Sequence, residues 1–169
     1  MIVRRDLMKK VGIIMGSDSD LPVIKKAVDV LREFDIPFEV HVYSAHRTPE
    51  EARDFSINAR KNGFGVIIAA AGMAAHLAGA IAANTTLPVI GIPCKSAAFD
   101  GMDALLSTVM MPSGIPVATV AVDGGKNAAL LAAEIIAVSD DELADALDRK
   151  RAADAAAVLK KDEDIMSRL

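Results

Sequence analysis

Short apolar runs alternate along the chain with segments in which apolar residues recur at helical spacing. A short continuous apolar run is typical of a buried strand, and recurrence every three to four residues is typical of an amphipathic helix. The pattern predicts strands at residues 11–15, 38–43, 66–71, 89–92 and 117–122. It predicts helices at residues 21–34, from 48 onward, 74–84, 101–110, 126–137 and from 140 to about 160.

Two of the helix starts carry capping signals. Thr48-Pro49-Glu50-Glu51 and Ser139-Asp140-Asp141-Glu142 both have a hydroxyl residue followed three positions later by Glu. This is the pattern of a capping box, in which the two side chains satisfy free backbone N–H groups at a helix N-terminus. We therefore expect the hydroxyls of Thr48 and Ser139 to cap these helices.

Strands that alternate with helices, several of them continuously apolar, predict a parallel sheet covered on both faces. The expected fold class is α/β, with three αβα layers, a flavodoxin-like parallel sheet of about five strands and an extended C-terminal helix. Ligands of such sheets bind beyond the carboxyl ends of the strands, where the strand order reverses. We therefore expect a site in the loops after the first three strands.

Length and composition narrow the function classes. The 169 residues show no linker or repeat, which predicts a single domain over residues 1–169, with its core at about 11–138 and the C-terminal helix at about 140–160. A net charge of -4 with scattered Lys and Arg argues against a nucleic-acid partner. The lone Cys94 and the charged first ten residues fit a cytoplasmic protein without a signal peptide.

One segment has the length of a membrane span. Residues 66–83 carry no formal charge, but 11 of these 18 residues are Ala or Gly. Insertion into a bilayer is driven by larger apolar side chains. A buried strand followed by a helix of small residues is the better interpretation, and we expect no membrane contact.

The loop after the first strand reads Gly16-Ser17-Asp18-Ser19-Asp20 and leads into a helix. Free backbone N–H groups at such a position, together with Ser hydroxyls, attract an anion. Two carboxylates repel a phosphate, so one of them has another task. Asp20 is the candidate to accept hydrogen bonds from a ribose diol; the alternative is that Asp20 or Ser19 only caps the helix.

The loop after the second strand reads Tyr43-Ser44-Ala45-His46-Arg47-Thr48-Pro49. The planar guanidinium of Arg47 suits a phosphate. His46 titrates near neutrality, so it can give and take one proton. His41, within the strand, is expected at the surface.

Around Gly72 the third loop is almost free of large side chains, so a flat ligand can approach its backbone. His76, taken alone, reads as a structural histidine. A metal shared by His46 and His76 is not favoured, because no carboxylate or Cys cluster accompanies them. Cys94 reads as a buried small side chain rather than a nucleophile, and residues 110–116 as a stiff apolar loop that could cover a pocket.

Five motifs occur in a fixed order: Gly16-Ser-Asp-Ser-Asp20, Ser44-Ala-His-Arg-Thr-Pro49, Ala74-Ala-His-Leu-Ala-Gly79, Met111-Pro-Ser-Gly-Ile-Pro-Val117 and Asn127-Ala-Ala-Leu-Leu-Ala-Ala133. Together they resemble the N5-carboxyaminoimidazole ribonucleotide mutase family of purine biosynthesis. The resemblance implies transfer of a carboxylate from the exocyclic nitrogen of an aminoimidazole ribonucleotide to ring carbon four, through trapped CO2. It further implies that no ATP, metal or biotin is needed, and that the chain assembles as a homo-octamer.

The same resemblance assigns roles to residues. Ser17, Ser19, Ser44 and Arg47 would hold the phosphate, and Asp20 would bind the ribose hydroxyls. His46 would be the acid–base catalyst, the Gly72 loop would face the imidazole, and His76 and Leu77 would belong to the substrate-binding set.

Two positions depart from the family pattern. The family usually reads Gly-Gly-Ala-Ala-His-Leu-Pro-Gly, whereas this chain has Met73 and Ala78 at the second Gly and the Pro. Two other functions stay open. One is a related carboxylase that adds CO2 directly to aminoimidazole ribonucleotide, whose loops differ near His76 and Leu77. The other is a non-catalytic module that binds phosphoribosyl ligands.

Overall fold

The structure is a computed structural model that describes residues 8–73 and 76–169. Within these residues one sheet holds five parallel strands in the order β2-β1-β3-β4-β5. The strands are β1 (Lys10–Met15), β2 (Phe38–Val42), β3 (Phe64–Gly72), β4 (Val89–Cys94) and β5 (Ala118–Thr119). This order confirms the flavodoxin-like sheet, and the order reverses between β1 and β3.

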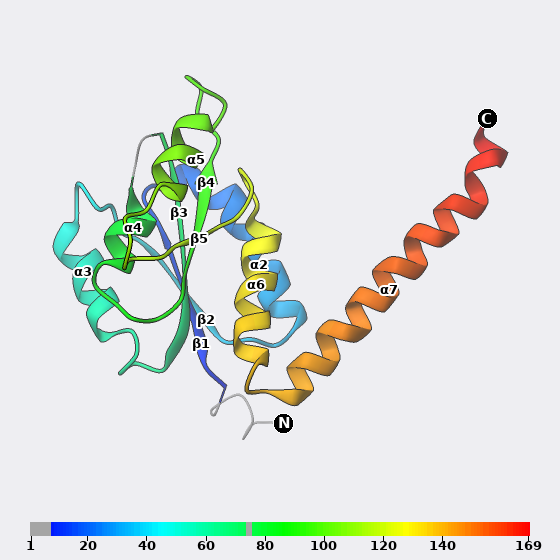
Figure 1. Ribbon diagram of the computed structural model, residues 1–169, viewed down its shortest axis with the longest axis horizontal. Coiled ribbons are helices and arrows are strands. Elements are labelled where there is room, and N and C mark those ends of the chain that lie inside the picture. The colour runs from blue at the N-terminus through cyan, green and yellow to red at the C-terminus, as the bar shows by residue number, and fades with distance from the viewer. Residues whose placement is uncertain (1–7, 74–75) are drawn as a thin grey trace.

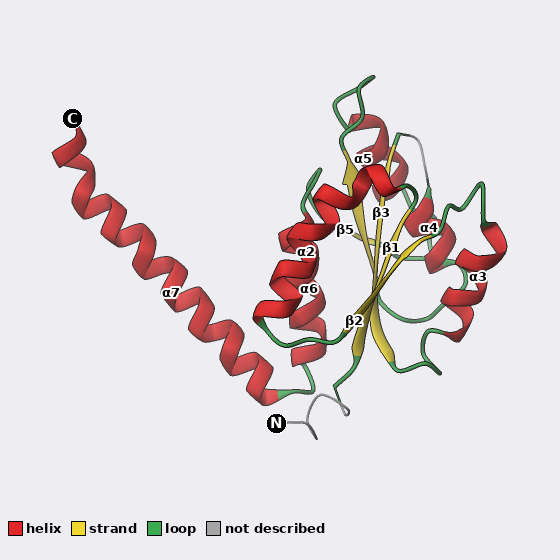
Figure 2. Cartoon of the chain, turned by 180° about the vertical axis from the view of Figure 1, so that it is seen from behind, coloured by secondary structure: helices red, strands yellow, loops and turns green. Residues whose placement is uncertain are grey.

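Helices cover both faces of the sheet (Figure 2). On one face lie α2 (Leu21–Glu33) and α6 (Gly125–Ala137), whose apolar sides share a core with alternate residues of β1, β3 and β4. On the other face lie α3 (Pro49–Asn58), α4 (Leu77–Ala82) and α5 (Met102–Val109). Residues 74 and 75, with which the helix at residues 74–84 was expected to begin, lie outside the described residues, as do residues 1–7.

Small residues let these layers approach closely. A Cβ atom on Gly125 would lie 2.3 Å from the backbone oxygen of Val23, so α6 packs against α2 at a distance that only Gly allows. A Cβ on Gly91 would lie 2.4 Å from a methyl of Thr108 and 3.2 Å from Ala78. Since Thr108 lies in α5 and Ala78 in α4, this glycine brings both helices onto the same face of β4.

The C-terminal helix α7 (Asp141–Ile165) begins against α6 and then leaves the body of the molecule (Figure 1). Leu143 and Leu147 are buried, and every residue from 151 onward is exposed. A short 3-10 turn, Met166–Arg168, ends the chain. The expected extended C-terminal helix is therefore present, and it runs somewhat beyond residue 160.

Both predicted capping boxes are wrong in detail, although each helix starts where expected. The Thr48 hydroxyl accepts from the backbone N–H of Ser44 (2.9 Å) instead of capping α3. At α7 the cap is Asp140, whose carboxylate accepts from the N–H of Leu143 (3.0 Å). The Ser139 hydroxyl instead donates to the carbonyl of Ile136 (3.4 Å), so both hydroxyls bond to backbone groups other than those expected.

Two further expectations change. The fifth strand is shorter than residues 117–122, although Val120 still donates to the carbonyl of Gly91 at 3.1 Å. His41 is half-buried rather than superficial, because its ring stacks on Tyr43 at a centroid distance of 4.9 Å and an interplanar angle of 7°. Among the described residues, no helix has the length and apolar character to span a bilayer.

Candidate active site

The loops after four adjacent strands surround one cavity of about 710 Å³ at the carboxyl edge of the sheet. Eight of the nine residues expected from the sequence line it: Ser17, Ser19, Asp20, Ser44, His46, Arg47, Gly72 and Leu77. These residues come from the segments that follow β1, β2 and β3. The structure therefore brings most of the expected chemistry into one cavity, next to the point where the strand order reverses.

The first loop forms a single 3-10 turn, Asp18–Asp20, before α2. The Ser17 hydroxyl accepts from the N–H of Ser19 and donates to the Asp18 carboxylate, both at 3.3 Å, so it organises the turn. Asp20 occupies the cap position of α2 but makes no capping hydrogen bond. Helix capping therefore does not account for Asp20, and its carboxylate lies at the cavity wall.

Asp20 is 9% exposed, which is low for an aspartate. Burial raises the pKa of its carboxyl, and the nearby Asp123 and Asp18 add to the rise. Contacts with the Cys94 thiol and the Ser17 backbone oppose it. A buried carboxylate keeps its charge only when donors surround it, so ligand hydroxyls are suitable partners for Asp20.

Cys94 lies directly behind this carboxylate and is 2% exposed. Burial, and then the charges of Asp20 and Asp123, raises the pKa of the Cys94 thiol to about 12. The thiol therefore stays protonated near neutral pH. It is a buried small side chain, as the sequence indicated, and not an activated nucleophile.

The second loop is held by its own hydroxyls. The Ser44 hydroxyl accepts from the backbone N–H groups of His46 (3.3 Å) and Arg47 (3.2 Å). The Arg47 guanidinium donates to the carbonyl of Gly16 at 2.8 Å, which ties the second loop to the first. His46 is exposed at the cavity with its backbone fixed, an arrangement suited to proton transfer with a bound ligand.

The third loop begins where β3 ends. Gly72 lies in register with Cys94 of β4, and a Cβ on Gly72 would lie 3.4 Å from the Cys94 carbonyl. The next residue, Met73, has φ +60° and is 67% exposed. A left-handed backbone costs a residue with a side chain about 1–2 kcal/mol. This cost explains why the family that the motifs resemble usually has Gly at this position.

His76 is the expected site residue that the cavity does not include. Its Nδ1 lies 2.6 Å from the carbonyl oxygen of Ser107, and its ring covers Gly79, where a Cβ would lie 1.9 Å from Nε2. The side chain therefore connects the start of α4 to α5. Its role in substrate binding stays a prediction.

The loop after β4 also lines the cavity, although the sequence pattern did not predict it. Lys95 and Ser96 line the same cavity. The backbone N–H of Lys95 donates to the Asp123 carboxylate (2.9 Å), and the Ser96 hydroxyl donates to Asp103 (3.1 Å). The signal was available, because β4 neighbours β3 in a flavodoxin-like sheet and its carboxyl end opens at the same edge.

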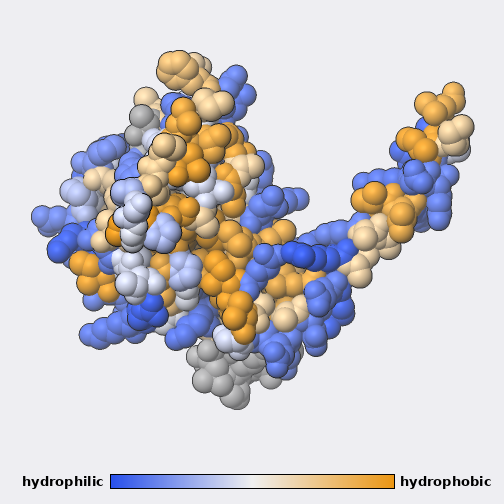
Figure 3. Space-filling view, viewed as in Figure 1, coloured by the Kyte–Doolittle hydropathy of each residue, from blue (hydrophilic) through white to orange (hydrophobic). Residues whose placement is uncertain are grey.

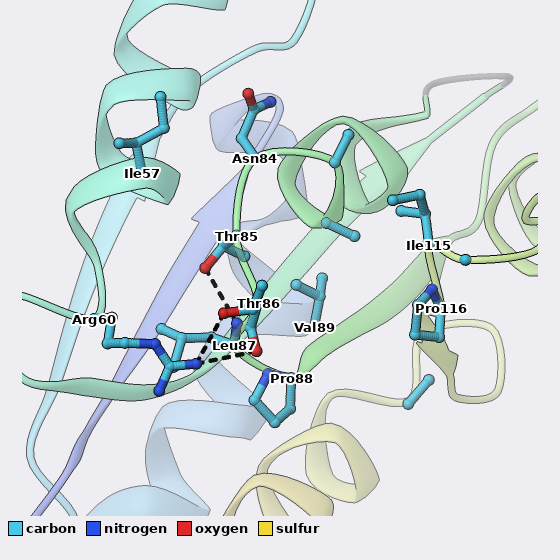
Figure 4. A pocket seen from close by; sticks show the side chains of 14 residues that line it. Ile57, Arg60, Asn84, Thr85, Thr86, Leu87, Pro88, Val89, Ile115 and Pro116 are labelled. Atoms are coloured by element: carbon cyan, nitrogen blue, oxygen red, sulfur yellow. Dashed lines mark hydrogen bonds between the residues drawn. The ribbon is translucent and has the colours of Figure 1, made fainter.

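A larger cavity of about 980 Å³ lies at the opposite edge, near the amino end of β4 (Figure 4). Its walls are mostly apolar, and Arg60, whose guanidinium donates to Thr86 (3.1 Å), is its charged residue. Gly114, Ile115 and Pro116 of the expected stiff loop form one side. Because the described residues that line this cavity include no acid–base group, it is not the candidate active site.

No group of three or more His, Cys, Asp or Glu side chains in residues 8–73 and 76–169 is arranged to hold a metal ion. His46 and His76 do not meet, since one faces the cavity and the other faces α5.

The chain is similar in sequence to proteins of one known family. Residues 10–157 match the family described as AIR carboxylase. The chain is 57% identical over 144 residues to the N5-carboxyaminoimidazole ribonucleotide mutase of Pyrococcus abyssi, an alignment that covers 85% of this chain and 83% of that protein. It is 56% identical over 130 residues to the phosphoribosylaminoimidazole carboxylase of Saccharomyces cerevisiae, but it covers only 23% of that longer protein.

A solved structure shows the same fold. The crystal structure of Treponema denticola PurE superimposes with a TM-score of 0.82 and 32% sequence identity. The match covers 92% of this chain and 97% of that one. The sheet order, the helical layers and the long C-terminal helix are therefore features of a known fold.

Proposed function

This chain belongs to the AIR carboxylase family, and we propose on that basis that it is an N5-carboxyaminoimidazole ribonucleotide mutase. It is an isomerase of purine biosynthesis that interconverts the N5-carboxylated ribonucleotide and 4-carboxy-5-aminoimidazole ribonucleotide. The observation that carries the proposal is the cavity in which Asp20, His46 and Arg47 meet beside the Gly72 loop. Relatives that align over most of their length carry the mutase name, whereas the carboxylase name belongs to proteins of which this chain covers about a quarter.

The substrate is held through its phosphate and its ribose hydroxyls. Ser17, Ser19, Ser44 and Arg47 bind the phosphate, because hydroxyl donors and a guanidinium lie together on the first two loops. Asp20 accepts hydrogen bonds from the ribose diol, which supply the donors that its buried carboxylate requires. The imidazole lies against the Gly72 backbone, with Leu77 as an apolar wall.

His46 carries the proton. It protonates the exocyclic nitrogen, the carbamate C–N bond breaks, and the amine and CO2 form. Carbon four, which the amine makes nucleophilic, attacks the CO2, and the ring proton returns to His46. One proton is given and one is taken, so one histidine is sufficient and no cofactor is required. A small apolar wall beside the reacting atoms keeps CO2 from water.

His76 acts at a distance in this proposal. Its Nδ1 is hydrogen-bonded to the Ser107 carbonyl of α5, and its ring covers Gly79 of α4. It therefore fixes the start of α4, directly after the loop that faces the imidazole. We further propose one functional domain over residues 1–169, a homo-octamer and a cytoplasmic location. Exposed apolar side chains of α5 and its flanks, among them Phe99, Met102 and Met110, support self-association.

The test is turnover of the N-carboxylated ribonucleotide with an isotopic label in its carboxylate. Unlabelled bicarbonate is in excess, chelator is present and ATP is absent. We expect the label to remain in the C-carboxylated product, because CO2 passes within the cavity. Loss of the label with a rate that follows bicarbonate would indicate the carboxylase, and absence of turnover would indicate a binding module.

The matched variants are His46→Gln and His41→Gln. His46→Gln should bind the ribonucleotide but turn over at least about a hundredfold more slowly, because general acid–base catalysis is lost. His41→Gln, outside the cavity, should turn over normally. Normal turnover by His46→Gln would contradict the role of His46.

A further inference from the structure

The cavity has a second cationic residue, Lys95, on the side opposite Arg47. Among the described residues that line it, Arg47 and Lys95 are the cations and Asp20 is the carboxylate. Arg47 follows β2, and Lys95 follows β4. The sheet order places β1 and β3 between them, so the two strand ends lie about 14 Å apart at a strand spacing of about 4.8 Å.

Lys95 lies beside the loop that faces the ring of the proposed substrate. Gly72 and Cys94 are in register, so the residues that follow them, Met73 and Lys95, leave the sheet edge next to each other. The hydroxyl donors Ser17, Ser19 and Ser44 lie on the first two loops, together with Arg47. The phosphate has its donors there, and Lys95 is the cation on the side of the heterocycle.

The ammonium of Lys95 is held loosely. Its Nζ lies 3.0 Å from the Asp100 carboxylate, and the two side chains are 60% and 82% exposed. This contact raises the pKa of Lys95, so the side chain stays charged. An exposed ion pair contributes little net stability, whereas the base of the loop is fixed separately by the Lys95 N–H bond to Asp123. A ligand carboxylate can therefore replace Asp100 without unfolding the loop.

We propose that Lys95 binds the carboxylate of the ribonucleotide and that Asp100 is its partner when the cavity is empty. This inference rests on the proposed function. Both the N-carboxylated and the C-carboxylated ribonucleotide carry this group, so Lys95 stabilises substrate and product alike. The CO2 that forms between them carries no charge, so Lys95 stabilises the bound substrate and product more than the transition state. Loss of Lys95 should therefore raise KM without lowering kcat.

The kinetic test compares Lys95→Gln, Lys95→Arg and Asp100→Asn with the unmodified chain. We expect Lys95→Gln to raise KM about tenfold without lowering kcat, and Lys95→Arg to restore most of the affinity. Asp100→Asn should lower KM about twofold, because it removes the competing carboxylate. Lys61→Gln, an exposed lysine before β3, is the control and should leave KM unchanged.

The binding test identifies which anion Lys95 contacts. Calorimetry in the His46→Gln background, in which turnover should be slow, compares the C-carboxylated ribonucleotide with the same ribonucleotide lacking the carboxylate. Adding Lys95→Gln should weaken only the carboxylated ligand. Equal weakening of both ligands would mean a phosphate contact, and no weakening would mean no contact; either result overturns the proposal. Failure of the unmodified chain to turn over would instead contradict the proposed function.

Discussion

At the scale of single residues, the cavity combines an anchored cation, Arg47, with a buried carboxylate, Asp20. Arg47 is anchored to the Gly16 carbonyl, so it meets an anion with little loss of side-chain freedom. Asp20 is buried beside the Cys94 thiol, and its pKa is raised by that burial. A carboxylate that is unfavourable in the empty cavity becomes favourable once ligand hydroxyls donate to it.

Asp20 therefore links stability to pH in a stated direction. Its folded pKa is raised above the unfolded value near 3.8, so ionisation destabilises the fold, and this cost is absent below pH 3.8 and present above the folded pKa. We expect Asp20→Asn to unfold at a higher temperature than the unmodified chain at pH 7, with the difference vanishing near pH 3. Thermal denaturation at several pH values measures this.

The same variant has an opposite effect on function. Asp20→Asn should bind the ribonucleotide more weakly, because the amide accepts fewer hydrogen bonds from the ribose diol than a carboxylate does. Unchanged affinity would refute the ribose role, and a stability difference independent of pH would refute the cause given for the pKa. Cys94→Ala is a companion variant rather than a control, since it keeps the carboxylate but removes the thiol contact that opposes the rise of the Asp20 pKa.

At the scale of elements, helix starts depend on which side chain reaches the free N–H groups. The α7 N-terminus has Ser139 and Asp140 as adjacent candidates, and the capping bond to Leu143 comes from Asp140. An extended residue at the cap position, here with φ −139° and ψ 93°, directs its side chain back over the first turn. Backbone conformation therefore decides which of the two residues caps α7.

This choice is testable by a pair of substitutions. Asp140→Ala should lower the free energy of unfolding by about 1 kcal/mol, the usual cost of losing an N-cap. Ser139→Ala should have a much smaller effect, because its hydroxyl donates to a carbonyl of α6 at a long 3.4 Å. Urea denaturation of both variants decides it, and a larger effect at Ser139 would restore the capping box that the sequence suggested.

At the scale of the whole molecule, the distal part of α7 projects from the body that the described residues form (Figure 1). From residue 151 onward it is exposed, and it carries Val158, Leu159, Ile165 and Met166 on its surface. Figure 3 shows apolar surface along the segment that projects from the body. Exposed apolar surface of this kind is typical of association sites.

We therefore expect deletion of residues 155–169 to reduce the assembled mass from that of the proposed octamer to that of a smaller species. The ion pairs that Lys150 forms with Glu33 (3.5 Å) and Arg151 with Glu134 remain, so the thermal midpoint of the monomeric body should change little. Light scattering after size exclusion measures the mass. An unchanged octamer would show that α7 is not required, and Lys160→Gln serves as a surface control.

The sequence alone determined the elements and the edge at which the site forms. Apolar period fixes strands and helices locally, and parallel strands place their following loops at one edge, so Ser17, Ser44, Arg47 and Gly72 had to converge. Right-handed crossovers left few alternatives to the observed sheet order. These features follow from short-range pattern and general topology, and the structure confirms them.

Only the tertiary structure decided where individual side chains point. His76 turns to the Ser107 carbonyl, the Thr48 hydroxyl bonds to Ser44, Cys94 lies against Asp20, and Lys95 joins the cavity from a fourth loop. Each of these contacts depends on partners supplied by other parts of the fold or by loop geometry that the apolar pattern does not encode. The physical reason is that periodicity fixes which face of an element is buried, whereas the partner of a polar group depends on which atoms the packed chain brings within hydrogen-bonding distance.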